Sequence, residues 1–72
     1  MELFDEVALL DDMPELGLVR GQVGTVVVVL SPSDVEVEFC DDQGRTYAMA
    51  ALRSEEIIRL RHYPIETGNN AT

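Results

Sequence analysis

Four consecutive valines at positions 26–29 constrain the fold of this 72-residue chain more than any other feature. Branching at Cβ restricts χ1 and makes valine a poor helix former, whereas the same side chain packs well on a pleated surface. The segment Gln22 to Leu30 is therefore predicted to be a strand. Both of its faces are apolar, yet a small barrel buries only one face. The other face needs a cover, which is the loop before it, the last strand around Ile57 and Ile58, or another protein chain.

A second strand follows from strict alternation between apolar and polar residues over positions 35–40. A period of two places every second side chain on the same face of a strand. The expected core set is Val35, Val37 and Phe39, and the expected solvent set is Glu36, Glu38 and Cys40. The turn 41–44 ends in Gly44, which takes a positive φ at no steric cost. The segment Arg45 to Ala51 is then the second arm of a hairpin.

The remaining segments complete a small β domain. We expect a first strand over Glu6 to Leu10 and a long loop over Asp11 to Gly21, with a last strand over Ile57 to Leu60. The apolar loop residues expected to fold back onto the core are Leu16, Leu18 and Val19. The segment Ser54-Glu55-Glu56 is expected to be a single helical turn opened by a serine cap.

These elements predict an all-β fold, namely a small five-stranded, SH3-like, partly open barrel with one short helical turn before the last strand. The barrel domain is expected to cover residues 1–61. Residues 62–72 contain few apolar side chains and are expected to form a disordered C-terminal tail.

Charge favours a protein partner over nucleic acid. Fourteen acidic residues stand against five arginines and no lysine, which gives a net charge of −9. Such a chain repels phosphate polymers at long range and attracts basic surfaces. The predicted protein-binding surface consists of the acidic strand face and the turn that follows it: Glu36, Glu38, Asp41 and Asp42. A second copy of the chain, paired through Val26 to Leu30 or through an edge strand, is an alternative partner.

Catalysis is not expected, so we predict no enzyme, no catalytic residue, no cofactor and no metal site. The single histidine, His62, lies at the start of the expected tail, and Cys40 lies among acidic neighbours. A serine, threonine or cysteine nucleophile is therefore expected to lack a nearby general base. The acidic pairs lack the spaced oxygen ligands of a metal loop, and no glycine-rich loop leads from a strand into a helix.

A cytoplasmic location is expected. A lone cysteine offers no internal disulfide, and the acidic first residues do not form a signal peptide. The apolar run Val26 to Leu30 is far shorter than the ~20 residues of a membrane-spanning helix.

Two resemblances extend these expectations. The segments 16–27, 35–39 and 44–48 resemble a family of small bacterial proteins, frequent in cyanobacteria, known as domain of unknown function 4926. Members beside toxin-like genes imply an antitoxin-like or immunity-like role. More distantly, Arg20 to Val26 is similar to the KOW motif of ribosomal and elongation proteins. That likeness implies an alternative, nucleic-acid contact through Arg20, Arg45 and Arg53. An accessory subunit of a larger enzyme is a third alternative.

Overall fold

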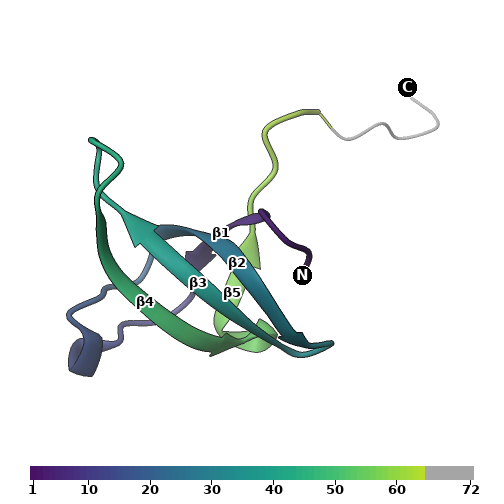
Figure 1. Ribbon diagram of the computed structural model, residues 1–72, viewed down its shortest axis with the longest axis horizontal. Coiled ribbons are helices and arrows are strands. Elements are labelled where there is room, and N and C mark those ends of the chain that lie inside the picture. The colour runs from purple at the N-terminus through teal and green to yellow at the C-terminus, as the bar shows by residue number, and fades with distance from the viewer. Residues whose placement is uncertain (65–72) are drawn as a thin grey trace.

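Five antiparallel strands form one sheet in the order β4-β3-β2-β1-β5 (Figure 1). The computed structural model describes residues 1–64. Its strands are β1 (Glu6–Leu9), β2 (Val23–Ser31), β3 (Asp34–Cys40), β4 (Thr46–Arg53) and β5 (Ile57–Arg59). Two single 3₁₀ turns, η1 (Pro14–Leu16) and η2 (Ser54–Glu56), are the only helical segments in the described part. The predicted all-β fold is confirmed.

The sheet coils into a partly open barrel. In Figure 1 the meander β2-β3-β4 lies in front, and β1 and β5 lie behind it. Strands β4 and β5 are the two edges of the sheet, and η2 connects them directly. The barrel therefore closes through a turn of the chain rather than through a strand pair.

The core confirms the alternation expected for β3. Val35, Val37 and Phe39 are fully buried, while Glu36 and Glu38 are half-buried and Cys40 is exposed. Residues from all five strands and from the β1–β2 loop share this core: Val7, Leu9, Met13, Leu18, Val26, Val35, Val37, Phe39, Ala50, Leu52 and Ile57. The inner side chains of β4 are thus Ala50 and Leu52, with Ala48 packed beside them.

The β1–β2 loop buries fewer apolar side chains than expected. Leu18 is buried, but the prediction is wrong for Leu16 and Val19, which are exposed. The reason is a backbone bridge in which the N–H of Met13 donates to the carbonyl of Leu18 at 2.8 Å, and Leu18 donates back at 3.1 Å. This bridge turns Met13 and Leu18 inward and leaves the short turn between them, ended by Gly17 at φ 70°, on the surface.

Strand β2 does not keep two regular faces. Val26 lies opposite Val37 and Val28 lies opposite Glu36, so the ladder skips one residue at Val27. This bulge moves Val28 onto the outer face beside Glu36 and places Val29 opposite the buried Val35. The two faces of β2 therefore exchange at Val27.

Gly24 allows strands β2 and β3 to approach each other closely. It pairs in regular register with Val7 of β1. A Cβ at this position would lie 2.5 Å from Cγ1 of Val37 and 2.9 Å from the carbonyl oxygen of Glu38. Only a glycine lets β2 pass this close to β3.

The 3₁₀ turn η2 is not capped by the residue that the sequence predicted. Ser54 does not cap η2 with its side chain. Instead, Oε1 of Glu56 accepts a hydrogen bond from the N–H of Arg53 at 2.8 Å. The N–H of Ser54 donates to the carbonyl of Ser33, which ties η2 to the β2–β3 turn. His62 pairs with Glu6, and residues 65–72 of the expected tail lie outside the described residues.

Candidate protein-binding surface

The outer face of β3 and β4 carries two of the predicted site residues side by side. Glu36 lies opposite Ala51, and Glu38 lies opposite Met49, so both carboxylates project from the same face. On the β2 side, Val28 lies opposite Glu36. The side chains of Met49 and Val28 are exposed. The result is a pair of acidic groups bordered on both sides by accessible apolar side chains.

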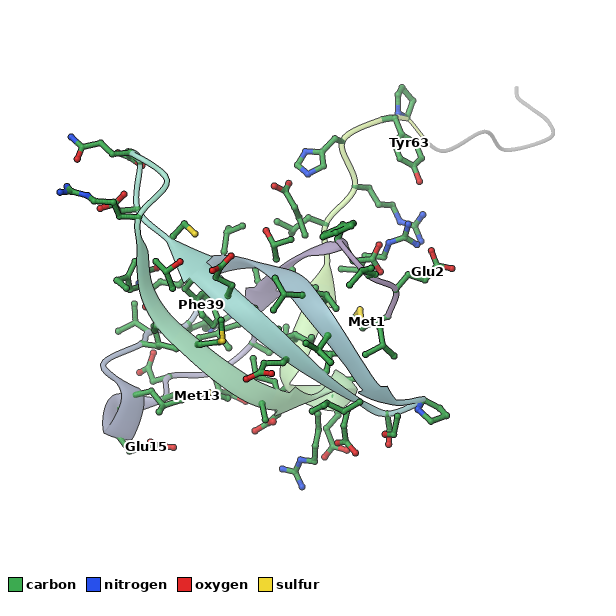
Figure 2. All side chains as sticks on the ribbon, viewed as in Figure 1. Met1, Glu2, Met13, Glu15, Phe39 and Tyr63 are labelled. Atoms are coloured by element: carbon green, nitrogen blue, oxygen red, sulfur yellow. The ribbon has the colours of Figure 1, made fainter. Side chains whose placement is uncertain are left out.

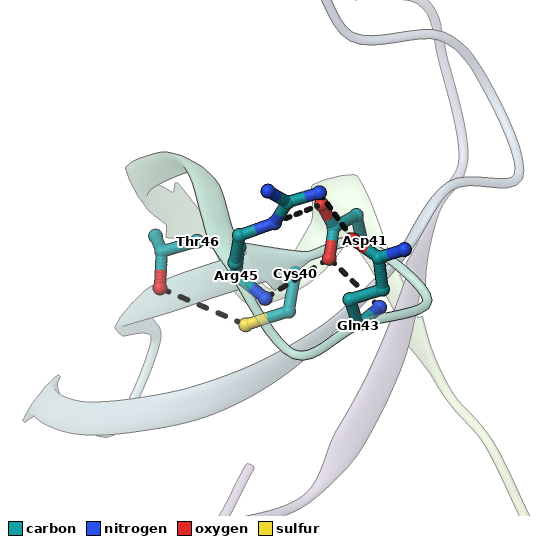
Figure 3. Close-up of polar contacts among 5 residues, drawn as sticks. All are labelled: Cys40, Asp41, Gln43, Arg45 and Thr46. Carbon is teal, nitrogen blue, oxygen red and sulfur yellow. Dashed lines mark hydrogen bonds and ion pairs between the residues drawn. The ribbon is translucent and has the colours of Figure 1, made fainter.

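Glu38 is held in place by Thr46. The hydroxyl of Thr46 donates to Oε2 of Glu38 at 2.7 Å. The same hydroxyl lies 3.7 Å from the sulfur of Cys40, as Figure 3 shows. A register shift after Phe39 places Thr46 opposite Cys40, and thus on the outer face. Simple alternation along β4 groups Thr46 with the inward Ala48, so the sequence pattern gave no signal for this contact.

No cationic side chain within residues 1–64 pairs with Glu36 or Glu38. Across residues 1–64, the ion pairs involve other carboxylates: Asp41 with Arg45, Glu56 with Arg53, Asp5 with Arg59, and Glu6 with His62. Three of the five arginines are therefore engaged within the chain. The two carboxylates on β3 are not neutralised by any described residue.

Asp41 serves the turn rather than the outer face. Its Oδ1 accepts hydrogen bonds from the N–H of Gln43 at 2.9 Å and of Arg45 at 3.0 Å (Figure 3). Its Oδ2 accepts from Nε of Arg45 at 3.2 Å. The backbone N–H of Arg45 is the main cause of a lowered pKa for Asp41, with Gln43 and the Arg45 side chain adding to the effect and burial opposing it. The neighbouring Asp42 is exposed.

The alternative arginine set is spread over the molecule. Arg45 precedes β4 and Arg53 ends it, and eight strand residues span about 26 Å. Arg45 pairs with Asp41, and Nε of Arg53 lies 3.8 Å from Oε1 of Glu56. Arg20 lies in the β1–β2 loop, where its N–H donates to Asp12. The structure thus does not gather these three residues into one basic patch, and the nucleic-acid contact stays a prediction.

The same part of the chain lacks the features of other kinds of site. Residues 1–64 enclose no pocket. Within that range, no group of three or more His, Cys, Asp or Glu side chains is placed to hold a metal ion. The described portion also has no helix long and apolar enough to cross a membrane.

A family model for a domain of unknown function, DUF4926, matches residues 3–59. The chain belongs to this family. The match extends from before β1 to the last residue of β5, so every strand of the DUF4926 domain falls within it. The comparison confirms the family predicted from the sequence, whereas the likeness to SH3 and KOW domains stays a prediction. No curated protein and no solved structure matches the chain.

Proposed function

We propose that this DUF4926 protein is a non-catalytic binding module that receives a basic surface of another protein on the outer face of β3 and β4. One observation carries the proposal: Glu36 and Glu38 project from the same face, and no cation within residues 1–64 pairs with either of them. An arginine or lysine of a partner supplies the missing charge.

The spacing of the two carboxylates suits such a contact. Residues two apart on a strand are separated by about 6.6 Å, so the two like charges reinforce each other's potential at the surface. An arginine guanidinium bridges or forks onto carboxylates with charge-assisted hydrogen bonds. Met49 and Val28 supply accessible apolar surface next to the charges, against which the methylene groups of an arginine or lysine side chain pack.

The net charge of −9 also favours a basic partner. Long-range attraction raises the rate at which a basic partner arrives, and this effect weakens as salt screens the field. We place the module in the cytoplasm as a stand-alone regulator or an antitoxin-like partner. An accessory subunit of a larger enzyme uses the same surface and falls under the same proposal.

The test is affinity purification of the tagged protein from its native cells at low and moderate salt, with protein and nucleic acid both quantified. The deciding variant is Glu36→Lys with Glu38→Lys. The matched control is Asp11→Lys with Glu15→Lys, which makes the same charge change at exposed positions outside the outer face. We expect the wild type and the control to recover a stoichiometric basic partner. The deciding variant is expected to recover at least tenfold less of that partner.

Two results contradict the proposal. Equal recovery of the partner by the deciding variant removes Glu36 and Glu38 from the interface. Recovery of nucleic acid without protein, with steep salt dependence, instead supports contact through Arg20, Arg45 and Arg53.

A further inference from the structure

Strand β2 continues beyond the strand that pairs with it. The β1–β2 ladder ends at Glu6 opposite Thr25. Two more backbone bonds follow: the N–H of Val26 donates to the carbonyl of Asp5 at 2.9 Å, and the N–H of Phe4 donates to the carbonyl of Val26 at 2.7 Å. Past this point, Val28, Val29 and Ser31 pair with β3 on one side, and no described strand pairs with residues 27–31 on the other. Half of β2 is an open edge.

The open edge is also apolar. Relative exposure is 41% for Val28, 45% for Val29 and 53% for Leu30. Open backbone together with exposed branched side chains is the combination to which an additional strand pairs. Charged residues, proline or a β-bulge usually protect such an edge. Residues 27–31 include no charged residue and no proline, and the protection they carry is the irregular pairing with β3 at Val27 and between Val29 and Ser31.

Phe4 marks the start of this edge in an unusual conformation. The N–H of Asp5 donates to the carbonyl of Glu2 at 3.1 Å, which closes a turn, and Phe4 occupies that turn at φ 70°. Glycine or asparagine normally takes this left-handed position, and a bulky residue is strained there. The Phe4 side chain is 71% exposed, so burial in the core does not explain the strain. Strained residues that persist in this way cluster at binding sites.

The turn is fixed to the body of the domain. Asp5 accepts a hydrogen bond from the N–H of Glu2 at 2.7 Å and pairs with Nε of Arg59 at 3.3 Å. Figure 2 shows Met1 and Glu2 on the side of β2 that faces away from β3. The exposed Phe4 ring is therefore held at the point where β1 stops covering β2.

We propose that the open edge of β2 binds an extended strand of the basic partner, with residues 27–31 supplying the backbone hydrogen bonds and Phe4 packing against the start of the added strand. The inference rests on the proposed function and specifies which element of the partner makes the contact. It is a case of strand addition, in which the main chain gives affinity and alternate side chains give specificity.

Successive side chains of an added strand point to opposite faces, and this alternation defines the sequence pattern of the ligand. An added side chain on the outer face lies beside Val28 and about 10 Å from Glu36, because neighbouring strands are about 4.8 Å apart. A lysine or arginine reaches across that distance to the carboxylate. An added side chain on the other face lies beside Val29 and is expected to be apolar. The ligand is thus a segment of about five residues in which basic and apolar positions alternate.

A second copy of the chain suits this edge less well. Pairing two β2 edges brings together two chains of net charge −9. None of the described arginines lies on the open edge to offset that repulsion. Charge complementarity therefore favours a basic strand.

The probe is a capped nine-residue peptide of alternating arginine and valine, titrated into the full ¹⁵N-labelled chain and followed by amide chemical shifts and hydrogen exchange. The control peptide has the same composition in two blocks, five arginines followed by four valines. We expect shifts and slowed exchange at residues 27–31 and at Phe4, and at least tenfold weaker binding of the block peptide.

Two variants separate the ring of Phe4 from general apolar attraction. Phe4→Gly is expected to weaken binding of the alternating peptide at least fivefold while the chain stays folded. Tyr63→Gly removes another exposed aromatic ring, at a residue 60% exposed and away from the edge, and is expected to leave binding unchanged.

Failure of this inference is distinguishable from failure of the proposed function. Equal binding of both peptides, with shifts confined to the outer face around Glu36 and Glu38, overturns strand addition and leaves the acidic surface in place. No binding at millimolar peptide also overturns it, and purification from cells then decides the proposed function by itself. A dimer of the chain alone, with residues 27–31 protected from exchange, assigns the edge to a second copy and overturns the inference as well.

Discussion

The side-chain amide of Gln22 donates a hydrogen bond to the hydroxyl of Tyr47 at 3.0 Å, although strand β3 separates β2 from β4 in the sheet. The same amide accepts a bond from the N–H of Val19 through its oxygen. The ring of Tyr47 lies 6.4 Å from that of Phe39, at the rim of the core. One glutamine thus links the β1–β2 loop to the edge strand β4 across one end of the barrel.

This link predicts a measurable coupling between the two residues. Tyr47→Phe removes the hydroxyl and is expected to lower the free energy of unfolding by about 0.5–1 kcal/mol, the usual net value of one neutral hydrogen bond. Gln22→Ala is expected to cost more, because it also removes the bond to Val19. Urea denaturation of both single variants and the double variant gives the coupling energy.

Tyr63→Phe is the control for that experiment, since Tyr63 is exposed beyond the last strand, and it is expected to leave stability unchanged. A coupling energy of zero between Gln22 and Tyr47 contradicts the role assigned to the link.

Strand β3 and its turn were predictable because they depend on local chemistry. Alternation at 35–40 gives the buried face directly, and Gly44 takes the positive φ that the turn needs. The bulge at Val27 was not predictable, because four identical side chains carry no signal for which one is skipped. The left-handed Phe4 was missed for a similar reason, since a phenylalanine does not indicate that conformation.

Gly24 gives a prediction about packing. Gly24→Ala places a methyl group against Val37 and the backbone of Glu38, at distances that real Cβ atoms do not tolerate. The neighbour at 2.9 Å is a backbone oxygen in a central strand, so it cannot move aside easily. We expect a loss of about 2–3 kcal/mol in the free energy of unfolding, the upper range for overpacking. Thermal and urea unfolding measure it.

Gly17→Ala is the matched control for steric crowding. Gly17 has a φ of 70° and nothing within 4 Å of an added Cβ. Its substitution is expected to cost about 1 kcal/mol, from backbone conformation alone. Equal losses for the two variants contradict the packing argument for Gly24.

The candidate surface was predictable in part. Alternation placed Glu36 and Glu38 together on the outer face, as observed. Grouping Asp41 with them overlooked the tendency of an aspartate in a turn to bind nearby backbone N–H groups, which is how Asp41 is used. Thr46 was missed because its side chain lies on the outer face only as a result of a register shift between β3 and β4.

Asp41 predicts a pH dependence that Asp41→Asn removes. The hydrogen bonds from Arg45 and Gln43 lower its pKa from the ordinary value of 3.8, so the folded protein favours the carboxylate more than the unfolded chain does. That stability is fully present above the unfolded pKa and is lost as pH falls through the lower folded pKa. Wild type should therefore melt at a higher temperature than Asp41→Asn at pH 7, and the difference should vanish toward pH 2.

Asp42→Asn is the control for that comparison, because the neighbouring Asp42 carries the same charge one residue further along the turn. Its melting difference from wild type is expected to stay small across the same range. A pH-independent difference for Asp41→Asn contradicts the lowered pKa.

Phe4 gives the last prediction, in which removing a large side chain does not destabilise the protein. The left-handed conformation costs a bulky residue about 1–2 kcal/mol, and glycine relieves it while losing about 0.5–1 kcal/mol in backbone entropy. Because the ring is mostly exposed, little burial is lost. Phe4→Gly is expected to raise the free energy of unfolding by about 0–1.5 kcal/mol. Leu3→Gly, at a residue without a positive φ, is expected to lower it by about 0.5–1 kcal/mol. Urea denaturation of the two variants decides the point, since destabilisation by Phe4→Gly means that the ring contributes to folding rather than being held at the open edge for a partner.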